Sequence, residues 1–140
     1  MNSWLHANDP YDASMTDSTL ASRRILIVDD DPDILGSIEL ALRAAGATTR
    51  TAADGSAAVS AIHDERPDLI VLDMMLPKAS GFLVMEKLQE LENPPPVIMV
   101  TANQGRRHQA YAESLGVGAY FQKPVPLQRL VAKVAELLAE

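Results

Sequence analysis

Two short apolar runs that each end in aspartate constrain the fold of this chain more than any other feature. Ile25 to Val28 run into Asp29, Asp30 and Asp31, and residues 69–72 run into Asp73. Runs of four β-rich apolar residues are typical of strands buried on both faces of a parallel sheet. The carboxyl ends of such strands meet at one crevice, where ligands bind. The sequence therefore predicts several carboxylates crowded together, whose repulsion a cation would relieve.

The composition narrows the class of protein. With 140 residues, 47% of them hydrophobic, we expect one folded domain with a packed core. The net charge of -7 argues against direct binding of nucleic acid, and the lack of cysteine excludes disulfides and thiolate chemistry. We expect no membrane span and no secretory signal, because no apolar stretch approaches ~20 residues and no basic segment precedes an apolar one. A cytoplasmic protein is the resulting expectation.

The chain divides into a polar start and a regular remainder. Residues 1–22 show no apolar period, so we expect a flexible N-terminal extension there and one domain over residues 23–140. Predicted strands are Ile25–Val28, Thr48–Ala52, Leu69–Leu72, Val97–Val100 and Ala119–Gln122. Predicted helices are Pro32–Ala45, Ser56–Asp64, a helix from Ser80 through Leu91, Arg106–Leu115 and Pro126–Leu138. Asp31, Asp54 and Ser80 are the expected N-caps of the first three helices.

Strands that alternate with helices predict an α/β fold with a parallel sheet and helices on both faces. The polar strand Thr48–Ala52 and the short strand Ala119–Gln122 suit the two edges, and the three apolar strands suit the centre. This arrangement matches the flavodoxin-like, five-stranded order 2-1-3-4-5.

Polar side chains follow four of these strands. Asp29 and Asp30 follow the first strand, Asp73 the third, Thr101 the fourth and Lys123 the fifth. In the order 2-1-3-4-5 they converge on one point. The set suits phosphoryl transfer to a carboxylate: acidic oxygens bind Mg²⁺, a carboxylate oxygen is the nucleophile, and the ammonium and hydroxyl groups stabilise the phosphoryl oxygens.

At these residues the sequence resembles the response-regulator receiver domains of two-component signalling, of the chemotaxis-type single-domain kind. The matching stretches are residues 25–32, 67–77 with Gly81, 96–102 and 118–124, and the resemblance covers about residues 24–139. It implies a phosphoprotein that catalyses its own phosphorylation and dephosphorylation rather than a conventional enzyme.

The resemblance also implies a role for each site residue. Asp73 matches the phosphoacceptor and also a ligand of Mg²⁺ (or Mn²⁺), Asp30 matches a direct ligand of the same ion, and Asp29 a ligand acting through water. The backbone carbonyl of Met75 matches the position that completes the metal site. Thr101 and Lys123 match the residues that contact the phosphoryl group, and Thr101 and Tyr120 the switch pair. A cis peptide bond is expected before Pro124.

Implied partners are a histidine kinase or histidine phosphotransfer protein as donor and an unknown downstream protein. The fourth helix, fifth strand and fifth helix, with Arg107, Tyr111 and Tyr120, form the expected switch surface, and phosphorylation could drive homodimer formation. Met75 and Asn103 flank the phosphoryl group and are expected to set its lifetime. Because no output domain follows Glu140, the chain is either a stand-alone receiver or a piece of a longer protein.

Two rival interpretations share part of the pattern. A haloacid-dehalogenase-type phosphatase would use Asp29, Thr101 and Lys123, but it needs a later acidic pair and leaves Asp73 without a role. A flavodoxin would need a phosphate-binding loop after the first strand, where the acidic residues 29–31 and 33 would repel the phosphate.

Overall fold

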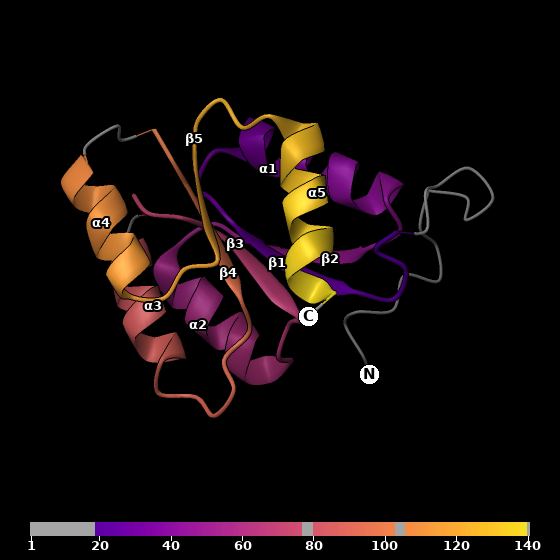
Figure 1. Cartoon of the computed structure of the whole chain (residues 1–140). Helices are drawn as coiled ribbons and strands as arrows, with labels where there is room; N and C mark the ends of the chain where they lie inside the picture. The colour runs from indigo at the N-terminus through magenta and orange to yellow at the C-terminus, as the bar shows by residue number, and fades with distance from the viewer. Residues whose placement is uncertain (1–18, 77–79, 103–105, 140) are drawn as a thin grey trace.

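In the computed structural model, residues 19–76, 80–102 and 106–139 are described, the side chains of residues 106–108 excepted. Five parallel strands form one sheet in the order β2-β1-β3-β4-β5, which confirms the predicted topology (Figure 1). The strands are β1 (Arg24–Val28), β2 (Thr48–Ala52), β3 (Leu69–Asp73), β4 (Val97–Thr101) and β5 (Ala119–Gln122). The helices are α1 (Pro32–Ala44), α2 (Gly55–Asp64), α3 (Gly81–Leu88), α4 (Arg106–Ser114) and α5 (Leu127–Leu138).

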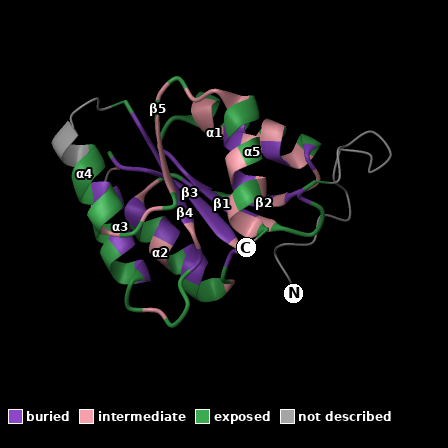
Figure 2. Cartoon of the chain, in the orientation of Figure 1, coloured by how far each residue is buried: buried purple, intermediate pink, exposed green. Residues whose placement is uncertain are grey.

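The helices cover both faces of the sheet and enclose a core on each side. α1 and α5 lie on one face, and α2, α3 and α4 lie on the other (Figure 1). The central strands β1, β3 and β4 are the most deeply buried part of the molecule (Figure 2). Because these strands are apolar on both faces, successive side chains point alternately into one core and the other.

The three predicted N-caps are confirmed. Asp31 accepts hydrogen bonds from the backbone N–H groups of Asp33 and Ile34, at 2.9 and 3.4 Å. The side chains of Asp54 and Ser80 cap α2 and α3 in the same way. Asp31 thus begins α1 next to the acidic residues that end β1, and this fixes where the chain turns away from the sheet.

The helix ends lie within one residue of the prediction, except the end of α3, which differs by three. α3 ends at Leu88 rather than Leu91, because the N–H groups of residues 90 and 91 bond to carbonyls three residues back, as in a tightened last turn. α5 begins at Leu127, so Pro126 is its N-cap residue rather than its first helical residue.

Leu20 belongs to the packed domain, although the sequence placed it in the flexible extension. Its side chain is buried in the core beside α1 and α5, and its N–H donates to the carbonyl of Ala45 at 2.8 Å. The packed part of the chain therefore begins no later than Leu20. The flexibility of the extension stays a prediction, since residues 1–18 lie outside the described part. None of the described helices has the length and apolarity that a membrane span requires.

Gly81 lies against the backbone of the strand end that carries Asp73. A Cβ atom there would overlap the Asp73 carbonyl oxygen and lie 2.7 Å from the Met74 Cα atom. We expect Gly81→Ala to destabilise the domain by about 1–3 kcal/mol, or roughly 4–12 °C in Tm, because rigid backbone atoms must move.

Gly36→Ala is the matched control for this change. Gly36 lies within α1, and a Cβ atom there would meet nothing within 4 Å. We expect it to stabilise the domain by about 0.5–1 kcal/mol, because alanine is the better helix former. Thermal unfolding of both variants checks the pair, and equal shifts would show that the close approach at Gly81 has no energetic weight.

Candidate functional site

The predicted acidic residues meet at the carboxyl ends of β1 and β3. These strands are neighbours with Val28 opposite Leu72, so Asp29 and Asp73 follow side by side. Asp29 is fully buried, Asp73 is 3% exposed, and Asp30 is exposed to solvent. One carboxylate oxygen from each of the three residues lies within 4.8 Å of the others. The sheet register therefore forms the predicted cluster.

Lys123 reaches this cluster from the end of β5. Its Nζ atom lies 2.7 Å from Oδ2 of Asp29 and 3.2 Å from Oδ2 of Asp73. Its backbone N–H donates to the Thr101 carbonyl at 2.8 Å, which fixes the lysine beside the end of β4. The peptide bond between Lys123 and Pro124 is cis, as predicted. One ammonium group is therefore shared between two buried carboxylates.

The pKa of the Asp73 carboxyl is raised above its usual range. Burial is the main cause, and the charge of Asp29 adds to it. The hydrogen bond from the Met75 N–H, at 3.1 Å, and the Lys123 ammonium lower the pKa but do not cancel the effect of burial. The charged form of Asp73 thus needs more positive charge than Lys123 provides.

The pKa of Lys123 moves in the direction that keeps it charged. Burial alone would lower this pKa, but the close contact with Asp29 and the charges of Asp73 and Asp29 together raise it. Ionised, the three carboxylates and one ammonium still carry an excess of negative charge. The site is therefore attractive to a cation.

The side chains fit a metal ion that prefers oxygen ligands. One oxygen of each buried carboxylate is already used: Asp31 N–H donates to Oδ1 of Asp29 at 2.9 Å, and Met75 N–H donates to Oδ1 of Asp73. Oδ2 of Asp29 is buried and accepts no hydrogen bond of normal geometry from the described residues, although Nζ of Lys123 lies beside it. This one buried acceptor, next to Asp73 and the exposed Asp30, could hold a hard divalent ion.

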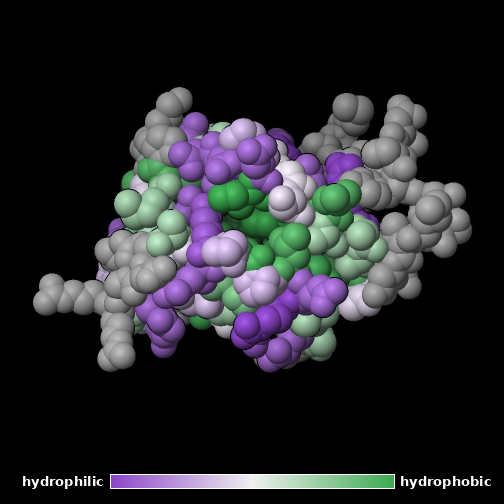
Figure 3. Space-filling model, turned by 90° about the horizontal axis from the view of Figure 1, so that it is seen from above, coloured by the Kyte–Doolittle hydropathy of each residue, from purple (hydrophilic) through white to green (hydrophobic). Residues whose placement is uncertain are grey.

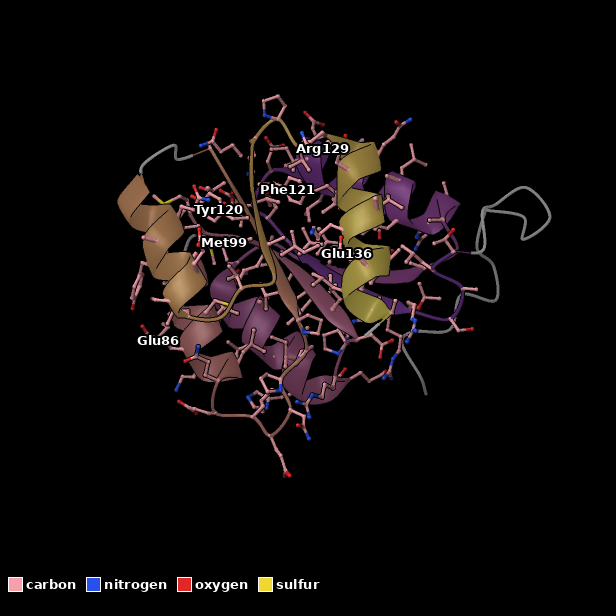
Figure 4. All side chains as sticks on the ribbon, viewed as in Figure 1. Glu86, Met99, Tyr120, Phe121, Arg129 and Glu136 are labelled. Carbon is pink, nitrogen blue, oxygen red and sulfur yellow. The ribbon has the colours of Figure 1, made fainter. Side chains whose placement is uncertain are left out.

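Thr101 and Tyr120 lie on the far side of this cluster. Thr101 is buried at the end of β4, one residue beyond Val100, which lies opposite Asp73. Tyr120 is partly buried on β5 beside Met99 and packs into the core under α4, whereas Phe121 points to the α5 side (Figure 4). The strand order thus brings the two predicted switch residues to neighbouring strands.

Other predicted residues are only partly described. The Met75 side chain is 59% exposed beside Asp73. The position of its carbonyl as a metal ligand stays a prediction. Asn103 and the side chain of Arg107 lie outside the described residues.

An apolar groove adjoins the site and was not predicted. It has a volume of about 510 Å³ and is lined by Ile34, Ser37, Ile38, Ala102, Lys123, Pro124, Val125 and Leu127. Hydrophobic residues also gather in a hollow on the face seen from above in Figure 3. The sequence feature that could have predicted this groove is the pair of apolar residues Val125 and Leu127, which follow Pro124 and belong to no strand.

Comparisons with known proteins agree with this geometry. The sequence-family model named response regulator receiver domain matches residues 25–135 of this chain. Among curated proteins, the transcriptional regulatory protein PrrA of Mycobacterium tuberculosis is 38% identical over 122 residues, which are 87% of this chain and 52% of PrrA. The alkaline phosphatase synthesis transcriptional regulatory protein PhoP of Bacillus subtilis is 34% identical, over 84% of this chain and 49% of PhoP. The chain spans about half the length of the curated relatives it matches.

Solved structures show the same fold. A CheY-like response regulator receiver domain protein from Methanospirillum hungatei superimposes with a TM-score of 0.80 at 33% identity, covering 85% of this chain and 95% of that one. The Francisella response regulator 1452 receiver domain gives a TM-score of 0.80 at 27% identity, over 84% of this chain and 98% of that one.

The raised pKa of Asp73 predicts a pH-dependent stability in metal-free protein. A carboxyl whose pKa is higher in the folded state favours folding when protonated, so its ionisation removes stability as the pH rises through the folded pKa. We expect Asp73→Asn to have a higher Tm than wild type at neutral pH in EDTA. This difference should shrink as the pH falls toward the unfolded value of 3.8.

Thermal unfolding of both proteins between about pH 4 and pH 8 measures the difference. If the wild-type protein had a higher Tm than Asp73→Asn at every pH in this range, the charge of Asp73 would not destabilise the fold and the prediction would be wrong.

Proposed function

The chain belongs to the response-regulator receiver domain family, and on this premise we propose that it receives a phosphoryl group on Asp73 from a phosphohistidine donor. The observation that carries the proposal is the shared contact of Lys123 with Asp29 and Asp73 inside a cluster of three carboxylates. In support of the proposal, the buried Asp73 lies beside two further acids and the Lys123 ammonium. Phosphoryl transfer needs mainly such positioning and charge compensation.

Each residue of the site has its own role in the proposed phosphoryl transfer. An ionised oxygen of Asp73 attacks the phosphorus, the phosphorus–nitrogen bond to the donor histidine breaks, and the leaving imidazole keeps the bonding electron pair and takes up a proton. Asp30 and Asp73 would hold Mg²⁺ (or Mn²⁺) directly, Asp29 would act through water, and the Met75 carbonyl would complete the ligand set. When bound there, the ion would supply positive charge for the phosphoryl oxygens. Lys123 exchanges its contact with Asp73 for one of those oxygens.

The raised pKa of Asp73 gives the metal a second role. Because burial disfavours the charged carboxylate that must attack, a cation beside it lowers that pKa and increases the fraction of competent nucleophile. In dephosphorylation, water attacks the phosphorus, the phosphorus–oxygen bond to Asp73 breaks, and inorganic phosphate leaves while the Asp73 carboxylate is restored. The chain therefore catalyses its own phosphorylation and dephosphorylation.

The phosphoryl group then acts as a switch. We propose that the Thr101 hydroxyl turns toward it, that Tyr120 moves inward, and that the surface of α4, β5 and α5 changes between two arrangements. That surface binds a downstream protein, and a phosphorylation-dependent homodimer is one form that such binding can take.

The donor is a histidine kinase or histidine phosphotransfer protein in the cytoplasm. The apolar groove beside Lys123 is a surface on which this donor can dock.

Phosphorylation of Asp73 is directly measurable. Acetyl phosphate with Mg²⁺ should add one phosphoryl group, about 80 Da by intact mass, to the wild-type protein and none to Asp73→Asn. Asp31→Asn is the matched control, because asparagine also caps helices and Asp31 serves only the start of α1. It should be phosphorylated like wild type. Equal labelling of Asp73→Asn would refute the proposal.

The exposed Met75 side chain is expected to lengthen the life of the acyl phosphate. It lies two residues from Asp73 and shields the phosphorus from water, because its surface is apolar. We expect Met75→Asn to dephosphorylate about two- to tenfold faster, which corresponds to roughly 0.4–1.4 kcal/mol in the barrier. Decay of the phosphoprotein followed by intact mass measures the rate. An unchanged rate would show that the side chain does not shield the site.

A further inference from the structure

Helix α4, part of the proposed switch surface, has little apolar anchorage of its own. Of its described side chains, residues 109–114, Ala112 alone is buried. An alanine buries little area, so its burial holds a helix weakly. The position of α4 therefore depends on contacts made by its exposed side chains and its ends.

Contacts among the described residues join α4, and Leu115 just after it, to α3 and to Gln89 just after that helix. The Tyr111 hydroxyl donates to Oε2 of Glu86 at 3.2 Å. The rings of Tyr111 and Phe82 meet edge to face, with centroids 4.8 Å apart and planes at 63°. At the end of α4, Nε2 of Gln89 donates to the Leu115 carbonyl. Glu86 lies on the part of α3 that is next to α4 (Figure 4).

From these contacts we infer that Tyr111, Glu86 and Phe82 form a latch that holds α4 in the arrangement seen here and thereby opposes phosphorylation of Asp73. The inference rests on the proposed function and assigns a regulatory part to that same site. α4 begins five residues after Thr101, so a displacement of Thr101 toward the phosphoryl group is transmitted to the start of this helix. The latch acts on the other half of the helix.

The chemistry of the latch suits a reversible switch. Glu86 raises the pKa of Tyr111, through their hydrogen bond first and its charge second, so the phenol stays protonated and able to donate at neutral pH. Tyr111 is 44% exposed and Glu86 is exposed, so water competes for both groups and the bond is weak. A weak contact shifts a two-state equilibrium without locking it.

Tyr111→Phe tests the latch, because it removes the hydroxyl and keeps the ring against Phe82. We expect this variant to bind Mg²⁺–beryllofluoride about two- to fivefold more tightly than wild type, since the bound anion no longer works against the hydrogen bond. The α4 amides should also exchange hydrogen about two- to fivefold faster, while those of β3 should not change. Titration followed by ¹H–¹⁵N NMR measures the affinity, and hydrogen exchange is measured without the anion.

Two further variants sharpen the test. Glu86→Gln weakens the same bond, so its effect should not add to that of Tyr111→Phe. Glu113→Gln removes a charge from α4 at a side chain that forms no hydrogen bond or ion pair with the described residues, and it should match wild type in both measurements.

The outcomes separate the two proposals. Unchanged α4 exchange in Tyr111→Phe would overturn the latch whatever the anion does. Faster exchange with unchanged affinity would overturn its regulatory part and leave the proposed function intact. Failure of the wild-type protein to bind beryllofluoride would overturn the proposed function, and the inference with it.

Discussion

The repulsion between two buried carboxylates at the ends of β1 and β3 is the constraint on which the site depends. Asp29 and Asp73 are held side by side by the sheet register, and burial makes their charges costly. Lys123, placed between them from β5, compensates part of this charge. The remaining negative charge favours a divalent cation, and we propose that this cation prepares Asp73 to accept a phosphoryl group.

The scaffold around these charges is closely packed. Apolar strands fill two cores, Asp31 begins α1 directly after the acidic residues, and Gly81 lies so close to the Asp73 backbone that no side chain fits. A site with unfavourable local electrostatics persists because the surrounding packing determines its geometry. By contrast, the described side chains of α4 hold it by one buried alanine and a few solvent-exposed contacts. This difference in anchorage separates the part that stays fixed from the part that we propose to move.

Much of this architecture could be predicted from the sequence, since it depends on local signals. Apolar runs gave the strands, Asp31, Asp54 and Ser80 marked the helix starts, and the polarity of residues 48–52 placed that strand at an edge. The residues after each strand then predicted which side chains meet. The burial of Leu20 and the early end of α3 were not predictable, because they depend on packing and on a tightened last turn. The bond from Tyr111 to Glu86 joins residues 25 positions apart on two helices, and no periodicity reveals it.

A crystal structure of the protein with Mg²⁺ and beryllofluoride tests the central claim most directly. The account predicts the beryllium bonded to a carboxylate oxygen of Asp73, the metal about 2.0–2.1 Å from oxygens of Asp30 and Asp73, and Nζ of Lys123 moved from Asp73 to a fluorine. An adduct on Asp29 or Asp30, or a metal held without Asp73, would contradict it.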